Sequence, residues 1–276
     1  FNREDALSGE ISTRYTMNVV GRQNGTGKYF VITDRFSDKT SVYLYDAEAN
    51  SFSDTAVLAH PEFDISNLIF SRRAEDFGEL IGFSYDGPVS TAYWLDPEMK
   101  GIQDGLNAAF PGKHVALVDY TADRNRVLFQ VSAPNSPPAY YVLVNKSKVA
   151  VIGSQRPWID EDSLGKGDFV YYTARDGMKI PAIITYPAGY REGDKAKGAI
   201  IVPHGGPWAR DYAGFDSSGW TQFFASRGYI IMQPQYRGSA GWGRELWLAG
   251  DGEWGQKMQD DKDDGAAWLV SQGYVD

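Results

Sequence analysis

The sequence predicts two kinds of architecture in one chain: β-propeller blades over residues 1–160, then an α/β domain over residues 161–276. Three observations predict this division. Short alternating runs of apolar and polar residues, typical of β-strands, recur in sets up to about residue 160. The pattern changes near Pro157, and the polar, glycine-containing stretch 161–167 is typical of a linker. Beyond it strands and helices alternate, which favours a parallel sheet with right-handed crossovers.

The N-terminal part consists of three similar units, each with three strand-like runs. Tyr43, Tyr93 and Tyr141 occupy corresponding places in the last run of each unit, at intervals of about 50 residues. This period is typical of four-stranded propeller blades, and because a ring needs about four to eight blades, these three form an incomplete one. Either more blades precede Phe1 or these units pack on something else; a β-sandwich with accidental periodicity is the alternative. The runs are residues 15–20, 28–33, 41–46, 65–70, 79–84, 91–96, 115–120, 126–131 and 139–144.

Composition narrows the class of protein and its partners. Hydrophobic residues make up 42% of the 276 and aromatic residues 14%, as in a globular protein. The formal net charge of −9 disfavours nucleic acid as a partner, and no apolar run approaches the roughly 18 residues that cross a bilayer. There is no cysteine, which excludes disulfides, thiolate metal sites and a cysteine nucleophile. Phe1 is not an initiator methionine, so the compartment stays open between cytoplasmic and periplasmic or secreted.

The second half alternates strands and helices with recognisable boundaries. Asp176-Gly177 between two apolar runs indicates a hairpin. Asp216-Ser217-Ser218 is a plausible N-cap for a helix through Ala225, and Gly228 ends that helix. The expected elements are strands 168–174, 179–186, 198–203 and 229–235, a glycine-rich loop 237–255 and a helix 257–271 ended by Gly273.

The strongest chemical signal is His204-Gly205-Gly206, directly after the apolar strand run 198–203. Two adjacent residues without side chains let backbone N–H groups approach a ligand oxygen, as in the oxyanion hole of α/β-hydrolases. We expect the N–H of Gly205 or Gly206 to stabilise an oxyanion, with His204 orienting the loop or donating a proton to the substrate oxygen. A tight turn that needs glycine only for its backbone conformation is the alternative. No serine lies within Gly-x-Ser-x-Gly, and neither Ser226 nor Ser239 is expected to be the nucleophile.

Four residues around this motif are candidates for substrate binding: Trp208, Arg210, Tyr236 and Arg237. Either arginine could hold a substrate carbonyl or carboxylate, or could instead pair with acids such as Asp211 and Asp216. The glycines after Tyr236 occur in the reverse order of a dinucleotide-binding loop, so we expect a loop at the mouth of an active site.

No metal and no cofactor are expected. The acidic run 260–265 fails as a calcium loop, because Lys262 occupies the third position and Ser271 the twelfth. An acidic first half of a helix accounts for it, since the helix dipole favours negative charge there. His60 and His114, at the edges of strand-like runs, are expected to be structural.

Together these motifs resemble the prolyl oligopeptidase family of serine peptidases, most of all its acylaminoacyl-peptidase and dipeptidyl-peptidase-like branch. The matching stretches are residues 204–210, 224–229, 236–243 and 252–261. The resemblance implies a seven- or eight-bladed propeller joined to an α/β-hydrolase domain that cleaves short peptides. It also implies that the loop 204–207 is the oxyanion loop, with Gly206 N–H and His204 as its donors.

In that family the helix matching 257–271 leads to a strand and then to Gly-x-Ser-x-Gly. The serine would then fall roughly a dozen residues past Asp276, with the aspartate and histidine later still. The chain is therefore expected to be a fragment that is inactive alone. Its expected partners are a peptide substrate and the missing C-terminal half of the hydrolase domain; a homo-oligomer is open. A carboxylesterase or lipase, and a non-catalytic propeller module, are the alternatives.

Overall fold

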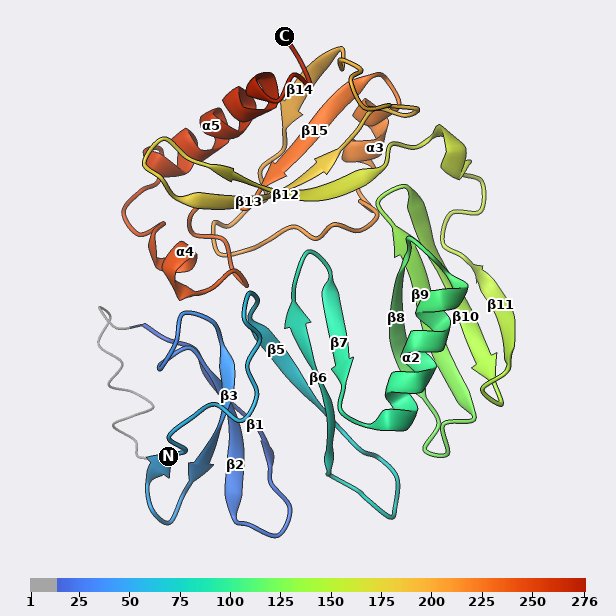
Figure 1. Cartoon of the computed structure of the whole chain (residues 1–276), viewed down its shortest axis with the longest axis vertical. Coiled ribbons are helices and arrows are strands. Elements are labelled where there is room, and N and C mark those ends of the chain that lie inside the picture. The colour runs from blue at the N-terminus through green and yellow to red at the C-terminus, as the bar shows by residue number, and fades with distance from the viewer. Residues whose placement is uncertain (1–13) are drawn as a thin grey trace. The chain divides into compact units, whose positions relative to one another are not determined.

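The structure is a computed structural model that describes residues 14–276 (Figure 1). The first 13 residues of the predicted propeller region lie outside the described part. Contacts divide the chain into two compact units. The first runs up to Gly101 and includes Gly241–Trp247, and the second comprises Ile102–Ala240 and Leu248–Asp276. The predicted domain boundary at residues 160–161 stays a prediction.

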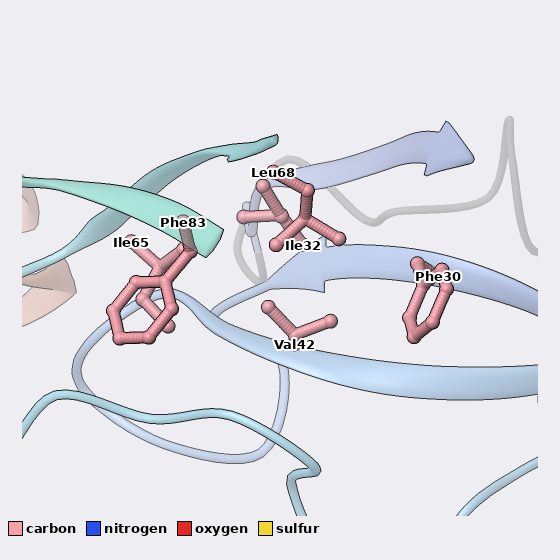
Figure 2. Packing of buried hydrophobic residues seen from close by; sticks show 6 residues of the cluster. All are labelled: Phe30, Ile32, Val42, Ile65, Leu68 and Phe83. Atoms are coloured by element: carbon pink, nitrogen blue, oxygen red, sulfur yellow. The ribbon is translucent and has the colours of Figure 1, made fainter. Parts of the chain in front are cut away.

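The first unit contains two antiparallel sheets whose strands follow the order of the chain. Their apolar side chains meet in one cluster, in which Val42 is fully buried and Ile65 is 1% exposed (Figure 2). Burying such a side chain contributes about 1.5–3 kcal/mol, so this cluster stabilises both sheets. The cluster comprises Phe30, Ile32, Val42, Ile65, Leu68 and Phe83. The strands are β1 (Met17–Arg22), β2 (Lys28–Thr33), β3 (Ser41–Asp46) and β4 (Ser51–Phe52) in one sheet, and β5 (Ile65–Phe70), β6 (Leu80–Asp86) and β7 (Ser90–Trp94) in the other.

The second of these sheets has three strands, where the sequence predicted four. The chain forms helix α2 (Pro97–Ala109) after β7 instead of a fourth strand. Asp96 caps this helix by accepting the N–H of Met99 at 2.9 Å, and Pro97 suits a first helical position because its missing N–H would have no partner there. Met99, Ile102 and Leu106 are buried at helical spacing, so apolar burial on one helix face replaces strand pairing.

The second unit contains a third antiparallel sheet and a mixed sheet. The third sheet again follows the chain, through β8 (His114–Tyr120), β9 (Arg126–Ala133), β10 (Ser136–Val144) and β11 (Lys148–Ser154). Each predicted strand run of the N-terminal part overlaps an observed strand. The mixed sheet has the order β12 (Gly167–Thr173), β13 (Lys179–Thr185), β15 (Tyr229–Pro234), β14 (Gly198–Ile201).

The predicted parallel sheet is only partly correct. β14 and β15 are parallel, whereas β12, β13 and β15 pair antiparallel. Three helices lie between or after these strands: α3 (Trp220–Ala225), α4 (Arg244–Leu248) and α5 (Lys257–Ser271). α5 has the predicted bounds, and α4 lies within the predicted glycine-rich loop. The predicted N-cap within residues 216–218 is wrong, because α3 begins at Trp220 and its N-cap is Gly219. The Asp216 carboxylate nevertheless accepts the N–H of Thr221 in the first turn at 3.0 Å.

The parallel pairing of β14 with β15 determines where the candidate site residues lie. Carboxyl ends of parallel neighbours meet at one edge of a sheet, which is where such sheets bind ligands. The loop 204–211 follows β14 and the loop 235–243 follows β15, so both leave the same edge of the sheet (Figure 1). Among the described helices, none is long and apolar enough to cross a membrane.

Candidate active site

Hydrogen bonds join the loop after β14 to the loop after β15. The hydroxyl of Tyr236 donates to the carbonyl oxygen of His204 at 2.7 Å. The N–H of Ala240 donates to the carbonyl oxygen of Ala209 at 2.9 Å. Tyr236 is only 5% exposed, and its ring stacks on the His204 ring with centroids 4.6 Å apart. The structure therefore brings predicted site residues from two loops together, and Tyr236 holds His204 in place through these contacts.

Both nitrogens of the His204 ring are engaged. Nδ1 lies 2.8 Å from the carbonyl oxygen of Gly205, which can only accept, so Nδ1 carries a proton. Nε2 lies 2.8 Å from the hydroxyl oxygen of Ser239. Burial lowers the pKa of His204, which favours the neutral ring. The single proton of the Ser239 hydroxyl then has two acceptors within reach, Nε2 of His204 and the carbonyl oxygen of Tyr236. Of the two predicted roles for His204, this arrangement favours orienting the loop over donating a proton to substrate.

Ser239 is a residue beside the candidate site that the sequence analysis did not select. It is fully buried, and besides Nε2 of His204 its hydroxyl has the carbonyl oxygen of Tyr236 at 2.6 Å as an alternative acceptor. The serine lacks the flanking glycines of a nucleophile, which is why its sequence offered no signal. Ser239 and His204 are 35 positions apart in the chain, so only the packing of their two loops shows that the serine contacts the histidine.

Gly205 and Gly206 are exposed residues. Within residues 14–276, neither N–H has an intramolecular acceptor. Gly206 adopts φ +127°, and a Cβ there would lie 2.7 Å from the backbone nitrogen of Trp208. A Cβ on Gly205 would meet nothing within 4 Å. The loop thus contains two amides without an acceptor in the described chain, and its conformation requires glycine at the second of them.

An exposed pair of tryptophans lies close to this loop. Trp208 is 54% exposed and Trp254 is 64% exposed, and their ring centroids are 6.2 Å apart. Large exposed rings in contact provide apolar surface of the kind that binds ligands. The sequence analysis chose Trp208 but not Trp254, which lies 46 positions later in the glycine-rich loop. Arg210, a third candidate, places its guanidinium 4.4 Å from the centroid of the Tyr212 ring.

Arg237 is held between two carboxylates. Its side chain, 3% exposed, donates to both oxygens of Asp261, from Nε at 2.9 Å and from a terminal nitrogen at 2.6 Å. It also donates to Asp176 at 2.9 and 3.2 Å. Its hydrogen bond holds the pKa of the Asp176 carboxyl below its usual range. Substrate contact by Arg237 stays a prediction, and this geometry speaks against it because the guanidinium is buried and paired.

The acidic run on α5 is explained by further ion pairs. Asp260 and Asp264 lie 3.0 and 2.8 Å from the guanidinium of Arg175, which precedes β13. Across residues 14–276, no three His, Asp or Glu side chains are grouped so that they could hold a metal ion. His60 stacks on Phe63 and Tyr85 at centroid distances of 5.1 and 4.4 Å, as a structural histidine does.

Comparisons with known proteins identify relatives of this chain. The family model of the prolyl oligopeptidase family matches residues 215–276. Dipeptidyl aminopeptidase BIII of Pseudoxanthomonas mexicana is 29% identical over 253 residues, covering 90% of this chain and 36% of that protein. Probable dipeptidyl-peptidase 5 of Emericella nidulans is 33% identical over 232 residues, covering 82% of this chain and 31% of that protein.

Solved structures show the same fold. A puromycin-hydrolyzing peptidase of Mycobacterium tuberculosis superposes with a TM-score of 0.67 at 18% identity, covering 96% of this chain and 40% of that chain. A structure from a study of two prolyl endopeptidases gives a TM-score of 0.66 at 17% identity, covering 95% and 37%.

The matches place the chain in the class of proteins that combine antiparallel β-sheets with an α/β domain. The chain belongs to the prolyl oligopeptidase family, which confirms the resemblance found in its sequence. It spans about a third of the length of the two curated relatives, 36% and 31%.

Proposed function

We propose that this chain is part of a serine peptidase that hydrolyses short peptides, and that it supplies the oxyanion-binding loop. The observation that carries the proposal is that Gly205 and Gly206 are exposed residues whose amides have no acceptor within the described chain. They follow β14, at the sheet edge where α/β proteins bind ligands. An amide there stabilises a carbonyl oxygen as it becomes negative, and one such donor is worth about 2.7–4 kcal/mol of barrier.

The nucleophile is proposed to lie beyond Asp276. In the described sheet β14 is an edge strand, with β15 on its one paired side. A further parallel strand beside β14 would end at the same edge as His204 and Gly206, and a serine on the turn after it would face the two amides. An aspartate and a histidine later in the chain would complete the triad, with the histidine taking the serine proton and the aspartate orienting the histidine.

The proposed reaction needs no cofactor. The serine oxygen attacks the peptide carbonyl carbon, and the oxyanion is held by the N–H of Gly206 and by the N–H that follows the serine. Trp208 and Arg210 are proposed to contact the peptide. His204 and Tyr236 hold the loop, through the ring stacking and hydrogen bonds described above.

We further propose that the three antiparallel sheets are blades of a β-propeller over residues 1–160, and that residues 161–276 form the N-terminal part of an α/β-hydrolase domain. Each of the three sheets follows the order of the chain, as a blade does. The similarity to prolyl oligopeptidase structures supports the same assignment.

The test compares two substrates and one covalent probe on the intact protein. We expect a fluorophosphonate to label one serine and a dipeptidyl p-nitroanilide to be hydrolysed faster than a p-nitrophenyl acyl ester. Hydrolysis of the ester alone would identify an esterase instead, and absence of both labelling and turnover would identify a binding module. Residues 1–276 expressed alone should hydrolyse neither substrate; turnover by them would refute the proposed position of the nucleophile.

A further inference from the structure

The loop after β15 is held at two places that belong to different units of the chain. Its first part, residues 236–240, is bonded to the loop of His204 in the second unit. The next part, residues 242–245, belongs to the first unit and is called the strap below. Gly241 joins the two parts covalently. A residue spans at most about 3.6 Å of extended chain, so very little slack separates Ser239 from the strap.

The strap is held through its backbone by the stretch before β3. The ammonium of Lys39 donates to the carbonyl oxygen of Trp242 at 2.6 Å. The N–H of Arg244 donates to the carbonyl oxygen of Asp38 at 2.8 Å, and the N–H of Glu245 donates to the Asp38 carboxylate at 2.7 Å. Because main-chain groups make these bonds, they determine the path of the strap and not only the position of its side chains.

Asp64 connects the strap to the first sheet. One of its carboxylate oxygens accepts the N–H of Thr40 at 2.8 Å and the other accepts the N–H of Gly243 at 2.9 Å. The residue is 9% exposed, so both bonds are shielded from water. Gly243 adopts φ +94°, and a Cβ there would overlap Asp38 and Lys39. The strap is therefore bound by a buried charge at a position where only glycine fits.

We propose that Asp64 is a positioning residue for the His204–Gly206 loop and acts through the strap. When the strap is bound, Ser239 and Ala240 are held from both sides, and they in turn hold His204 and Ala209. When the strap is released, the loop after β15 keeps only its bonds within the second unit. The consequence for catalysis rests on the proposed function, whereas the coupling between the strap and the loop does not.

Hydrogen exchange in the intact protein tests the coupling. Asp64→Ala removes acceptors of charge-assisted bonds, so the amides of residues 242–245 should exchange about tenfold or more faster. The amide of Ala240, whose acceptor lies on the His204 loop, should also exchange faster. The matched control is Asp46→Asn, because Asp46 accepts the N–H groups of Glu48 and Ala49 in its own turn and pairs with Lys28 on β2, and none of these residues belongs to the strap. Faster exchange of the strap with an unchanged Ala240 amide would overturn the proposal.

Turnover of a dipeptidyl p-nitroanilide tests the effect on catalysis. Asp64→Ala should lower kcat about tenfold and leave KM unchanged, because it loosens the group that binds the transition state. Asp64→Asn keeps one acceptor oxygen, so its kcat should lie between the kcat of Asp64→Ala and that of the wild type. An unchanged kcat with a released strap would overturn the positioning role.

Two further comparisons keep the outcomes separate. If Asp64→Ala does not fold, Lys39→Met offers a second test, because it removes the bond to Trp242 together with the ion pair to Asp38. It should show the same pattern with smaller changes in exchange, and no change in either the strap or Ala240 would then count against the coupling. If the wild type has no peptidase activity, the proposed function fails, and the exchange of Ala240 still decides the coupling.

Discussion

Replacing Gly206 with alanine tests the oxyanion loop most directly, with Gly205→Ala as the matched control. Both substitutions keep the backbone N–H, so any loss of activity reflects the position of the amide and not its removal. At Gly206 the new Cβ would lie 2.7 Å from the backbone nitrogen of Trp208 and 3.2 Å from that of Ala209. These contacts are with backbone, so no side-chain rotation relieves them. At Gly205 the Cβ would meet nothing within 4 Å.

The magnitude follows from the backbone conformation and the chemistry of the site. A non-glycine residue held near φ +127° costs about 1–3 kcal/mol, so the loop should move instead of accepting the contact. Loss of one oxyanion donor lowers kcat by about 10²–10³. We therefore expect Gly206→Ala to lose two to three orders of magnitude in kcat with little change in KM, whereas Gly205→Ala should stay within a few-fold of the wild type.

The assay measures hydrolysis of a dipeptidyl p-nitroanilide by the intact protein, with active sites counted by fluorophosphonate labelling. Thermal unfolding of each variant shows whether it is folded. A folded Gly206→Ala variant with the kcat of Gly205→Ala would refute the assignment of these amides as oxyanion donors.

The remaining predictions concern stability, measured by urea unfolding. Arg237→Met should lower the free energy of unfolding by about 3–5 kcal/mol, because a buried carboxylate loses its partner; Lys257→Met, at a surface pair of 3.7 Å, should cost less than about 1 kcal/mol. Equal losses of unfolding free energy in the two variants would contradict the argument that burial makes the Arg237 ion pair more important for stability. Gly105→Ala should raise stability by about 0.5–1 kcal/mol, since the position is exposed within α2 and open around the new Cβ. Gly165→Ala should lower stability, because its Cβ would overlap a backbone carbonyl oxygen; a neutral result would show that this segment can move. Burial lowers the pKa of His204 in the folded state below its ordinary 6.5, so the unfolded state takes up the proton first and stability should fall as the pH drops below about 6.5. His204→Asn should remove that part of the pH dependence, and an identical pH dependence in both proteins would contradict the burial argument.

Local patterns predicted most of the strands and the longest helix near the C-terminus. Alternation of apolar and polar residues marks β2, β3 and β5 with their observed bounds, and α5 begins and ends where predicted. Helix α2 was missed although its signals are present: Asp96-Pro97 is an N-cap followed by a first-turn proline, and Met99, Ile102 and Leu106 are apolar at helical spacing. The sequence analysis assumed a repeated four-stranded unit and therefore did not use these helix signals.

The ion pairs between residues distant in the chain could not be predicted from the sequence. The sequence analysis considered Asp211 and Asp216 as partners for Arg237, because they lie nearby in the chain. The observed partners, Asp176 and Asp261, come from the turn after β12 and from α5. Nearness along the chain is a poor guide to ion pairs, because sheet and helix packing decides which side chains share a buried site.

The sequence by itself determined the recurring strands, the family and the glycine pair after β14, since periodicity and short motifs are local properties. Tertiary structure decided which of these groups can act. The parallel pairing of β14 with β15 brings two loop origins to one edge, where Ser239 meets His204 and the amides of Gly205 and Gly206 stay open. Most backbone N–H groups of a folded protein find an acceptor, and that acceptor is often distant in the sequence. An amide without an acceptor can therefore be recognised only in the three-dimensional structure.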